Sequence, residues 1–256
     1  MVNWKGIPRR LVGVLLLTGL LAVVTTETAL PLETTAGSFE LVPQETWAGH
    51  STCGAVIDVN LNGDPTDVGG YETLLTFDDA YLDYTEGNIA LTDFLTAGGT
   101  RNSSGFDGGA GAAMLESVHG SSLRFGDFSW PASLPAAPGA NAPGALASLM
   151  LDVVQCGNST VSLSEIWLVD TSAAVLPLGA EPAVAVPVHH LLDVAPPFGI
   201  INAGDVGAVS ARYFDLIDPT CGSADYMLDV AAPFGIINAG DVGAVAASYF
   251  AVTGCP

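Results

Sequence analysis

The sequence predicts a mainly β protein, in which a β-sandwich or jelly roll precedes a small α-helical module of two loop–helix repeats. Residues 37–177 hold short runs rich in β-forming residues, separated by Gly, Asn, Asp and Pro, which is typical of a sandwich. Residues 191–256 contain a duplicated segment, which predicts two copies of one structural unit. The 256 residues, with 30 Gly and 16 Pro, suffice for a sizeable core and many turns.

The charge balance limits the classes of partner. The chain has 27 acidic and 6 basic residues, and its formal net charge is −21. A protein this acidic is repelled by phosphate backbones, so we exclude nucleic acid as a partner. Anionic membrane surfaces are disfavoured for the same reason.

The first residues predict export. Lys5, Arg9 and Arg10 precede an apolar run over residues 11–24, the pattern of a secretory signal peptide. The run is shorter than the ~20 residues of a membrane-spanning helix. We expect a signal peptide over residues 1–29, with cleavage as late as Ala36 or an uncleaved N-terminal anchor as alternatives. The rest of the chain is then extracellular or at the cell surface, and a cleaved mature chain has no membrane span.

Four cysteines in an exported chain indicate two disulfides. The cysteines are Cys53, Cys156, Cys221 and Cys255, and three connectivities are possible. The simplest expectation pairs Cys53 with Cys156 inside the sandwich and Cys221 with Cys255 inside the repeat module. Between these parts, residues 178–190 are expected to form a semi-extended linker.

The repeat predicts two short helices, each preceded by a Pro/Gly loop. Residues 191–215 and 227–251 are identical at 20 of 25 positions, at an offset of 36. Asn202 and Asn238 are good N-cap residues, and an aspartate follows three residues later in each copy, where the helix dipole favours an acid. Val206, Val209 and Tyr213 predict an apolar stripe, which the second copy repeats.

The repeat resembles a dockerin, a small calcium-stabilised module of two loop–helix units. In the first copy Asp193, Gly199, Ile201, Asn202 and Asp205 match the dockerin loop pattern. The second copy matches it through Asp229, Gly235, Ile237, Asn238 and Asp241.

The resemblance marks six candidate calcium ligands: Asp193, Asn202, Asp205, Asp229, Asn238 and Asp241. The loops depart from the dockerin pattern because Ala195 and Pro197 stand where oxygen ligands are expected, and one extra residue precedes Gly199. Calcium takes about six to eight oxygen ligands. We therefore expect it to bind weakly or not at all, with the loop prolines, phenylalanines and a disulfide holding the loops. The alternative is that backbone carbonyls complete a site.

Residues 38–177 resemble a cohesin, the β-sandwich partner of dockerins. The segments AVIDVNLNG, GGYETLLTFDDAYLDYTEG and LASLMLDVVQCGNSTVSLSEIWLVDTSA carry the resemblance, in the order in which cohesin strands occur. The resemblance implies a non-catalytic adaptor that binds a cohesin- or dockerin-like protein, which includes a second copy of this chain. It places the recognition residues directly after the loop Asn, at Ala203 and Gly204 and at Ala239 and Gly240.

Two other functions stay open. Trp47, Trp130 and Trp167 would stack on sugar rings if one sheet face exposed them together, so a carbohydrate-binding module is the alternative; Trp167 packing in the core is the competing expectation. A structural surface protein whose repeat packs on its own sandwich is the other. The sequence has no Ser-His-Asp arrangement, HExxH or phosphate loop, so we expect no enzyme.

Overall fold

The computed structural model describes residues 36–44, 46–48, 54–96, 99–103, 117–217 and 225–255, all within the compact unit Thr34–Pro256. The expected signal peptide over residues 1–29 lies outside the described residues. So do Cys53 and Cys221. In the part that the structure describes, no helix is long and apolar enough to cross a membrane.

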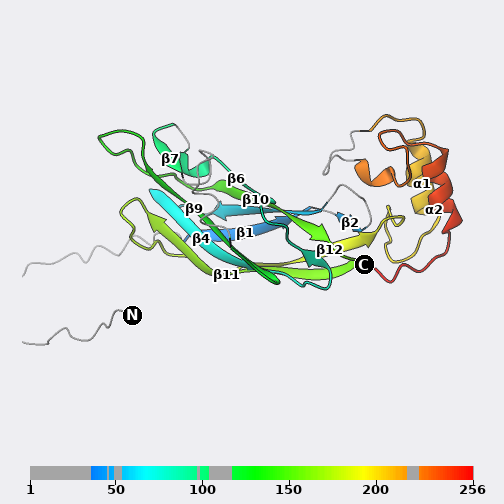
Figure 1. Ribbon diagram of the computed structural model, residues 1–256, viewed down its shortest axis with the longest axis horizontal. Helices are drawn as coiled ribbons and strands as arrows, with labels where there is room; N and C mark the ends of the chain where they lie inside the picture. Colours follow the sequence, from blue (N-terminus) through cyan, green and yellow to red (C-terminus); the bar gives the residue numbers. More distant parts are fainter. Residues whose placement is uncertain are drawn as a thin grey trace, which may run out of the picture. The chain divides into compact units, whose positions relative to one another are not determined.

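Two sheets form the sandwich, as expected (Figure 1). The five-stranded sheet has the order β1–β3–β10–β5, and β6 also pairs with β10. Its strands are β1 (Ser38–Pro43), β3 (Ala55–Asn62), β5 (Leu82–Asp83), β6 (Ile89–Leu91) and β10 (Gly144–Val153). All of its pairings are antiparallel, so one face can be buried while the other meets water.

The seven-stranded sheet has the order β2–β12–β11–β4–β9–β7, with β8 pairing the other part of β9. Its strands are β2 (Thr46–Ala48), β4 (Val68–Thr76), β7 (Arg101–Ser103), β8 (Ser117–His119), β9 (Ser122–Pro131), β11 (Gly157–Asp170) and β12 (Ala183–His190). The pairing of β12 with β2 is parallel. A short 3-10 helix, Phe94–Thr96, also contributes buried residues.

Alternating residues of both sheets build the core. In β3, Ile57, Val59 and Leu61 are fully buried and alternate with half-buried polar residues. Tyr71 of β4 joins the two sheets, because its hydroxyl donates to the Leu146 carbonyl of β10 at 3.1 Å. Burial raises the pKa of the Tyr71 phenol well above its usual range, and the Asp127 charge adds to the effect.

The expected linker is wrong over most of its length. Residues 183–190 form β12, a strand inside the seven-stranded sheet, instead of a semi-extended connection. The segment AVAVPV alternates with period two, and it buries Val186 and Val188 completely. Pro187 has no N–H to donate. It is tolerated because β12 pairs with β2 only from Val188 onward, so no hydrogen bond from residue 187 to β2 is required.

The repeat module contains the two expected helices, α1 (Ala203–Ala211) and α2 (Ala239–Ala247), and a 3-10 helix at Tyr226–Leu228. The helices contact each other, and Val209 and Val245 are fully buried in a cluster with Ile201 and Ile237. The expected apolar stripe stops before Tyr213, because α1 ends at Ala211 and Tyr213 is 41% exposed.

Candidate functional site

Each loop of the repeat module is held by its own aspartates. In the first unit both carboxylate oxygens of Asp205 accept backbone N–H groups, from Ala195 at 2.8 Å and from Asn202 at 2.7 Å. Asp193 Oδ2 accepts the Gly199 N–H at 2.6 Å, and Gly199 has the left-handed φ of 100° that favours glycine. These charge-assisted bonds close the loop onto the start of α1.

The second unit repeats this geometry. Asp241 accepts from Ala231 at 2.8 Å and from Asn238 at 2.7 Å, and Asp229 accepts from the Gly235 N–H. Both helices start with a capping box, in which Asn202 or Asn238 caps the helix and the aspartate three residues later reaches back. The predicted N-caps and first-turn acids are confirmed.

Most side-chain oxygens that the resemblance marks as calcium ligands in the first loop already accept hydrogen bonds. Asp205 gives both oxygens to backbone donors, the Asn202 oxygen accepts from Gly204 at 2.7 Å, and Asp193 Oδ2 also accepts from Thr253 at 3.3 Å. Asp193 Oδ1, which is buried and has no hydrogen-bond partner in the described structure, is the oxygen that remains. Calcium takes about six to eight oxygens, so a site here would need backbone carbonyls or the remaining lone pairs of the bonded oxygens beside Asp193 Oδ1. The described residues contain no group of three acidic, His or Cys side chains suited to a metal.

The two units bind each other through reciprocal backbone pairing. The segment after α1 pairs with the second loop: Phe214 donates to the Ile237 carbonyl at 2.8 Å, and Ile237 donates to Asp215 at 3.1 Å. The segment after α2 pairs with the first loop in the same way, because the Phe250 N–H donates to the Ile201 carbonyl at 2.7 Å. Each unit therefore gives the other the same backbone contact, although the first loop also packs on the sandwich.

The outer faces of the two helices consist of small, exposed residues. Ala203 and Gly204 of α1 are exposed, and so are Ala239 and Gly240 of α2. Gly207 and Gly243 continue each face one turn later, and a Cβ built on either meets no atom within 4 Å. The residues that sequence reasoning singled out for recognition therefore lie on open surface, and each helix adds a glycine to that surface.

The repeat module is tied to the sandwich instead of hanging on a linker. Cys156, which follows β10, pairs with Cys255 at a Cα–Cα distance of 5.6 Å, so the expected within-module pairing is wrong. Trp47 of β2 is buried against Tyr226, with ring centroids 6.0 Å apart. The imidazole of His189 in β12 stacks on the ring of Phe198 in the first loop, with ring centroids 3.9 Å apart. Phe234, its counterpart in the second loop, is 53% exposed. The expectation that both loop phenylalanines hold their loops through buried rings is therefore not met in the second loop.

A second feature lies on the outer face of the seven-stranded sheet. Trp167 of β11 is 55% exposed, and Phe128 and Trp130 of β9 are 44% and 41% exposed. The expectation that Trp167 packs in the core is wrong, because a bulge between Ser164 and Trp167 turns its ring outward. Trp47 is buried and does not belong to this face. The sequence alone could have placed Phe128 and Trp130 on one face, because residues two apart in a strand share a face.

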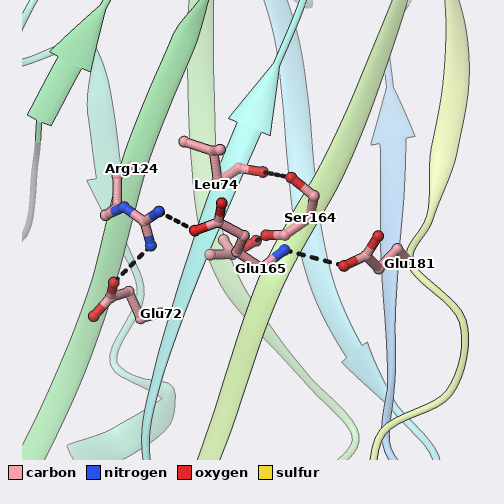
Figure 2. Close-up of polar contacts among 7 residues, drawn as sticks. Glu72, Leu74, Arg124, Ser164, Glu165 and Glu181 are labelled. Atoms are coloured by element: carbon pink, nitrogen blue, oxygen red, sulfur yellow. Dashed lines mark hydrogen bonds and ion pairs between the residues drawn. The ribbon is translucent and has the colours of Figure 1, made fainter.

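Arg124 forms a charged bridge on the same face (Figure 2). Its guanidinium contacts Glu72 at 2.9 Å and also Glu165, which lies on the bulge of β11. The hydrogen bonds that Arg124 donates to Glu165 and Glu72 raise the pKa of its guanidinium above the usual value. Sequence reasoning missed this arrangement, because the three residues lie on three strands that are far apart in the chain.

Comparisons with known proteins returned structures only. No family model matches the chain, and no curated protein matches it. The chain is similar to the sixth cohesin of scaffoldin B from Acetivibrio cellulolyticus, solved with a dockerin, at 15% identity and a TM-score of 0.42, over 60% of this chain and 99% of that one. It is also similar to a cohesin module of a family 33 glycoside hydrolase from Clostridium perfringens, at 12% identity and a TM-score of 0.41, over 61% and 99%. A non-cellulosomal cohesin from the archaeon Archaeoglobus fulgidus is similar at 11% identity and a TM-score of 0.38, over 58% and 91%.

Proposed function

We propose that the chain is an exported, non-catalytic adaptor that binds another protein through its repeat module. The observation that carries the proposal is the duplicated helix face. Two helices with nearly the same sequence expose the same small residues, Ala203, Gly204 and Gly207 in one and Ala239, Gly240 and Gly243 in the other. A helix face without bulky side chains lets a partner sheet approach the backbone closely.

The partner that fits best is a cohesin-like sheet face. The module resembles dockerins in sequence, and in dockerins the residues after the loop Asn often carry recognition. Because the two units exchange equivalent contacts, either helix can face the partner, with the module turned over between the two modes. The partner then meets one helix at a time, which predicts complexes with one partner per chain.

In this proposal the sandwich holds the repeat module in a fixed position. The Cys156–Cys255 disulfide and the buried Trp47 contact hold the module to the sandwich, so binding does not have to order a loose linker. Less ordering on binding means that less of the interaction energy is lost. The signal-like N-terminus supports export, and we propose that the adaptor works outside the cell or at its surface.

The test is a titration of the full chain with purified cohesin modules, followed by size-exclusion chromatography with light scattering. The proposal expects a complex with one cohesin module per chain. The chain alone is run in parallel, because a stable dimer would identify a second copy as the partner. If the chain binds no cohesin module of a varied set and does not self-associate, the adaptor proposal is wrong.

A further inference from the structure

The outer face of the seven-stranded sheet carries three large aromatic rings that are about half exposed. Phe128, Trp130 and Trp167 have 41–55% of their surface exposed, although the outer face of an antiparallel sheet is normally polar. They come from β9 and β11, the two strands that flank β4. Phe128 and Trp130 lie with their ring centroids 5.7 Å apart. Exposed apolar surface gathered in this way marks a binding surface.

The strand register leaves a hollow between these rings. Gly70 of β4 lies opposite Phe128 of β9 and opposite Val169 of β11. Two residues further on, Glu72 lies opposite Trp167. Because Gly70 has no side chain, the floor is bare backbone, and a hollow of about 190 Å³ lies between Trp167, Val169 and Phe128. A Cβ on Gly70 would lie 3.1 Å from the Phe128 Cβ, so a larger residue would crowd the floor.

The polar groups of this hollow lie at one end. Glu72 lines the hollow, and Arg124 joins it to Glu165 (Figure 2). The side chains of Glu72 and Glu165 are 44% and 57% exposed, so oxygens not used by Arg124 can accept hydrogen bonds from a ligand. The bridge fixes both carboxylates in place, which lowers the ordering cost of binding.

The charge of the surface selects among ligands. One guanidinium faces two exposed carboxylates, those of Glu72 and Glu165. The local balance is negative, as is the whole chain at −21. An anionic ligand is therefore repelled, whereas a neutral ligand rich in hydroxyl groups meets several acceptors and one donor group.

We propose that this hollow binds a neutral polysaccharide. The C–H face of one sugar ring stacks on Trp167, with Phe128 against its other side, and its hydroxyls donate to Glu72 and Glu165. The volume is below the roughly 300 Å³ at which drug-sized pockets begin, which suits a single sugar ring. Trp130 extends the platform beside Phe128, so a chain of sugars can continue across the sheet. This site lies on β4, β9 and β11 and is separate from the helix faces proposed for the protein partner.

Isothermal titration of the full chain with cellohexaose, xylohexaose and mannohexaose tests the site, with hexagalacturonate as the charged counterpart. We expect at least one neutral hexasaccharide to bind and hexagalacturonate not to bind. Trp167→Ala should weaken binding about tenfold or more, because it removes the stacking ring, and Trp167→Phe should restore part of the loss. Tyr249→Ala is the control, because it truncates a ring that is also 41% exposed but lies on the repeat module.

The outcomes separate this proposal from the adaptor function. The double substitution Gly207→Arg with Gly243→Arg should leave saccharide binding unchanged. The site is refuted if no neutral hexasaccharide binds, or if Trp167→Ala, with its melting temperature preserved, binds as the native chain does. If Trp167→Ala instead removes binding of a cohesin module and no saccharide binds, the sheet face is a protein interface and the saccharide proposal is wrong.

Discussion

The indole Nε1 of Trp47 donates a hydrogen bond to the carbonyl oxygen of Asp193 at 3.0 Å. This bond joins β2 of the sandwich to the first residue of the first repeat loop. Trp47 is 2% exposed and packs with Tyr226 and Met227, where the second unit begins. The sandwich and the repeat module therefore share a small buried cluster.

Removing the Trp47 ring should destabilise the chain strongly. Trp47→Ala opens a cavity and leaves the Asp193 carbonyl without its donor, so we expect a loss of about 3–5 kcal/mol in the free energy of unfolding. Trp130→Ala removes an exposed ring and should change it by no more than about 0.5 kcal/mol. Urea unfolding followed by far-ultraviolet circular dichroism measures both. Equal effects of the two substitutions would contradict the shared cluster.

The disulfide prediction concerns connectivity and stability together. Non-reducing peptide mapping should yield a Cys156–Cys255 peptide, which joins residues separated by 99 positions. Loop-entropy reasoning gives about 4–5 kcal/mol as an upper guide for such a crosslink. The double substitution Cys156→Ala with Cys255→Ala should therefore lower the melting temperature markedly. A Cys53–Cys156 peptide would show that this connectivity is wrong.

Calcium should have little effect on the repeat module. The carboxylates that a dockerin would give to calcium are bonded here to backbone N–H groups, as in Asp205 with Ala195 and Asn202. We expect the same melting temperature in calcium and in chelator. Asp205→Asn should still destabilise the chain, by about 1–3 kcal/mol, because the amide accepts only through one oxygen. Micromolar calcium affinity with a large chelator-induced drop in melting temperature would overturn this account.

Tyr71 predicts a loss of stability in alkali. Burial raises its pKa in the folded state, so its contribution is fully present below the unfolded-state pKa of about 10 and is lost as pH rises toward the folded-state value. Above about pH 10 this residue alone should cost about 1.4 kcal/mol per pH unit. Tyr71→Phe should lose about 1–2 kcal/mol at pH 7, with its bond to Leu146, but show a shallower alkaline decline.

Ile57→Val serves as the control for this pH dependence. Ile57 is fully buried and does not titrate, so the substitution should cost about 1 kcal/mol and leave the alkaline slope of the native chain unchanged. Urea midpoints measured between pH 7 and pH 11 compare the three proteins. If Tyr71→Phe declines as steeply as Ile57→Val, the assigned cause is wrong.

Local sequence signals predicted the sandwich class and the repeat helices well. Asn202 and Asp205 form a capping box within four residues, so short-range chemistry alone located the start of α1. In β3, the alternation of Ile57 and Val59 was equally local. The same signal was present in residues 183–188, but the segment was assigned to a semi-extended linker, and strand β12 was missed.

Long-range relationships could not be predicted in the same way. Cys156 and Cys255 meet only because the repeat module folds back on the sandwich, and no local pattern encodes that contact. Trp167 faces outward because of a bulge that shifts the register by one residue, which reverses the face of every following side chain. The Arg124 bridge requires the order of three strands, and single-sequence periodicity does not give that order.

The central claim is that two equivalent helix faces serve one partner, and surface plasmon resonance with an immobilised cohesin module tests it most directly. Gly207→Arg and Gly243→Arg are the sharpest variants, since their Cβ positions are open, whereas a Cβ on Gly204 would lie 3.0 Å from the capping oxygen of Asn202. Arg also favours a helix over Gly by under about 1 kcal/mol, so folding is preserved. The account predicts that each single variant binds within about twofold of the native chain, because one face remains, and that the double variant does not bind. Loss of all binding in one folded single variant, or native affinity in the double variant, would contradict it.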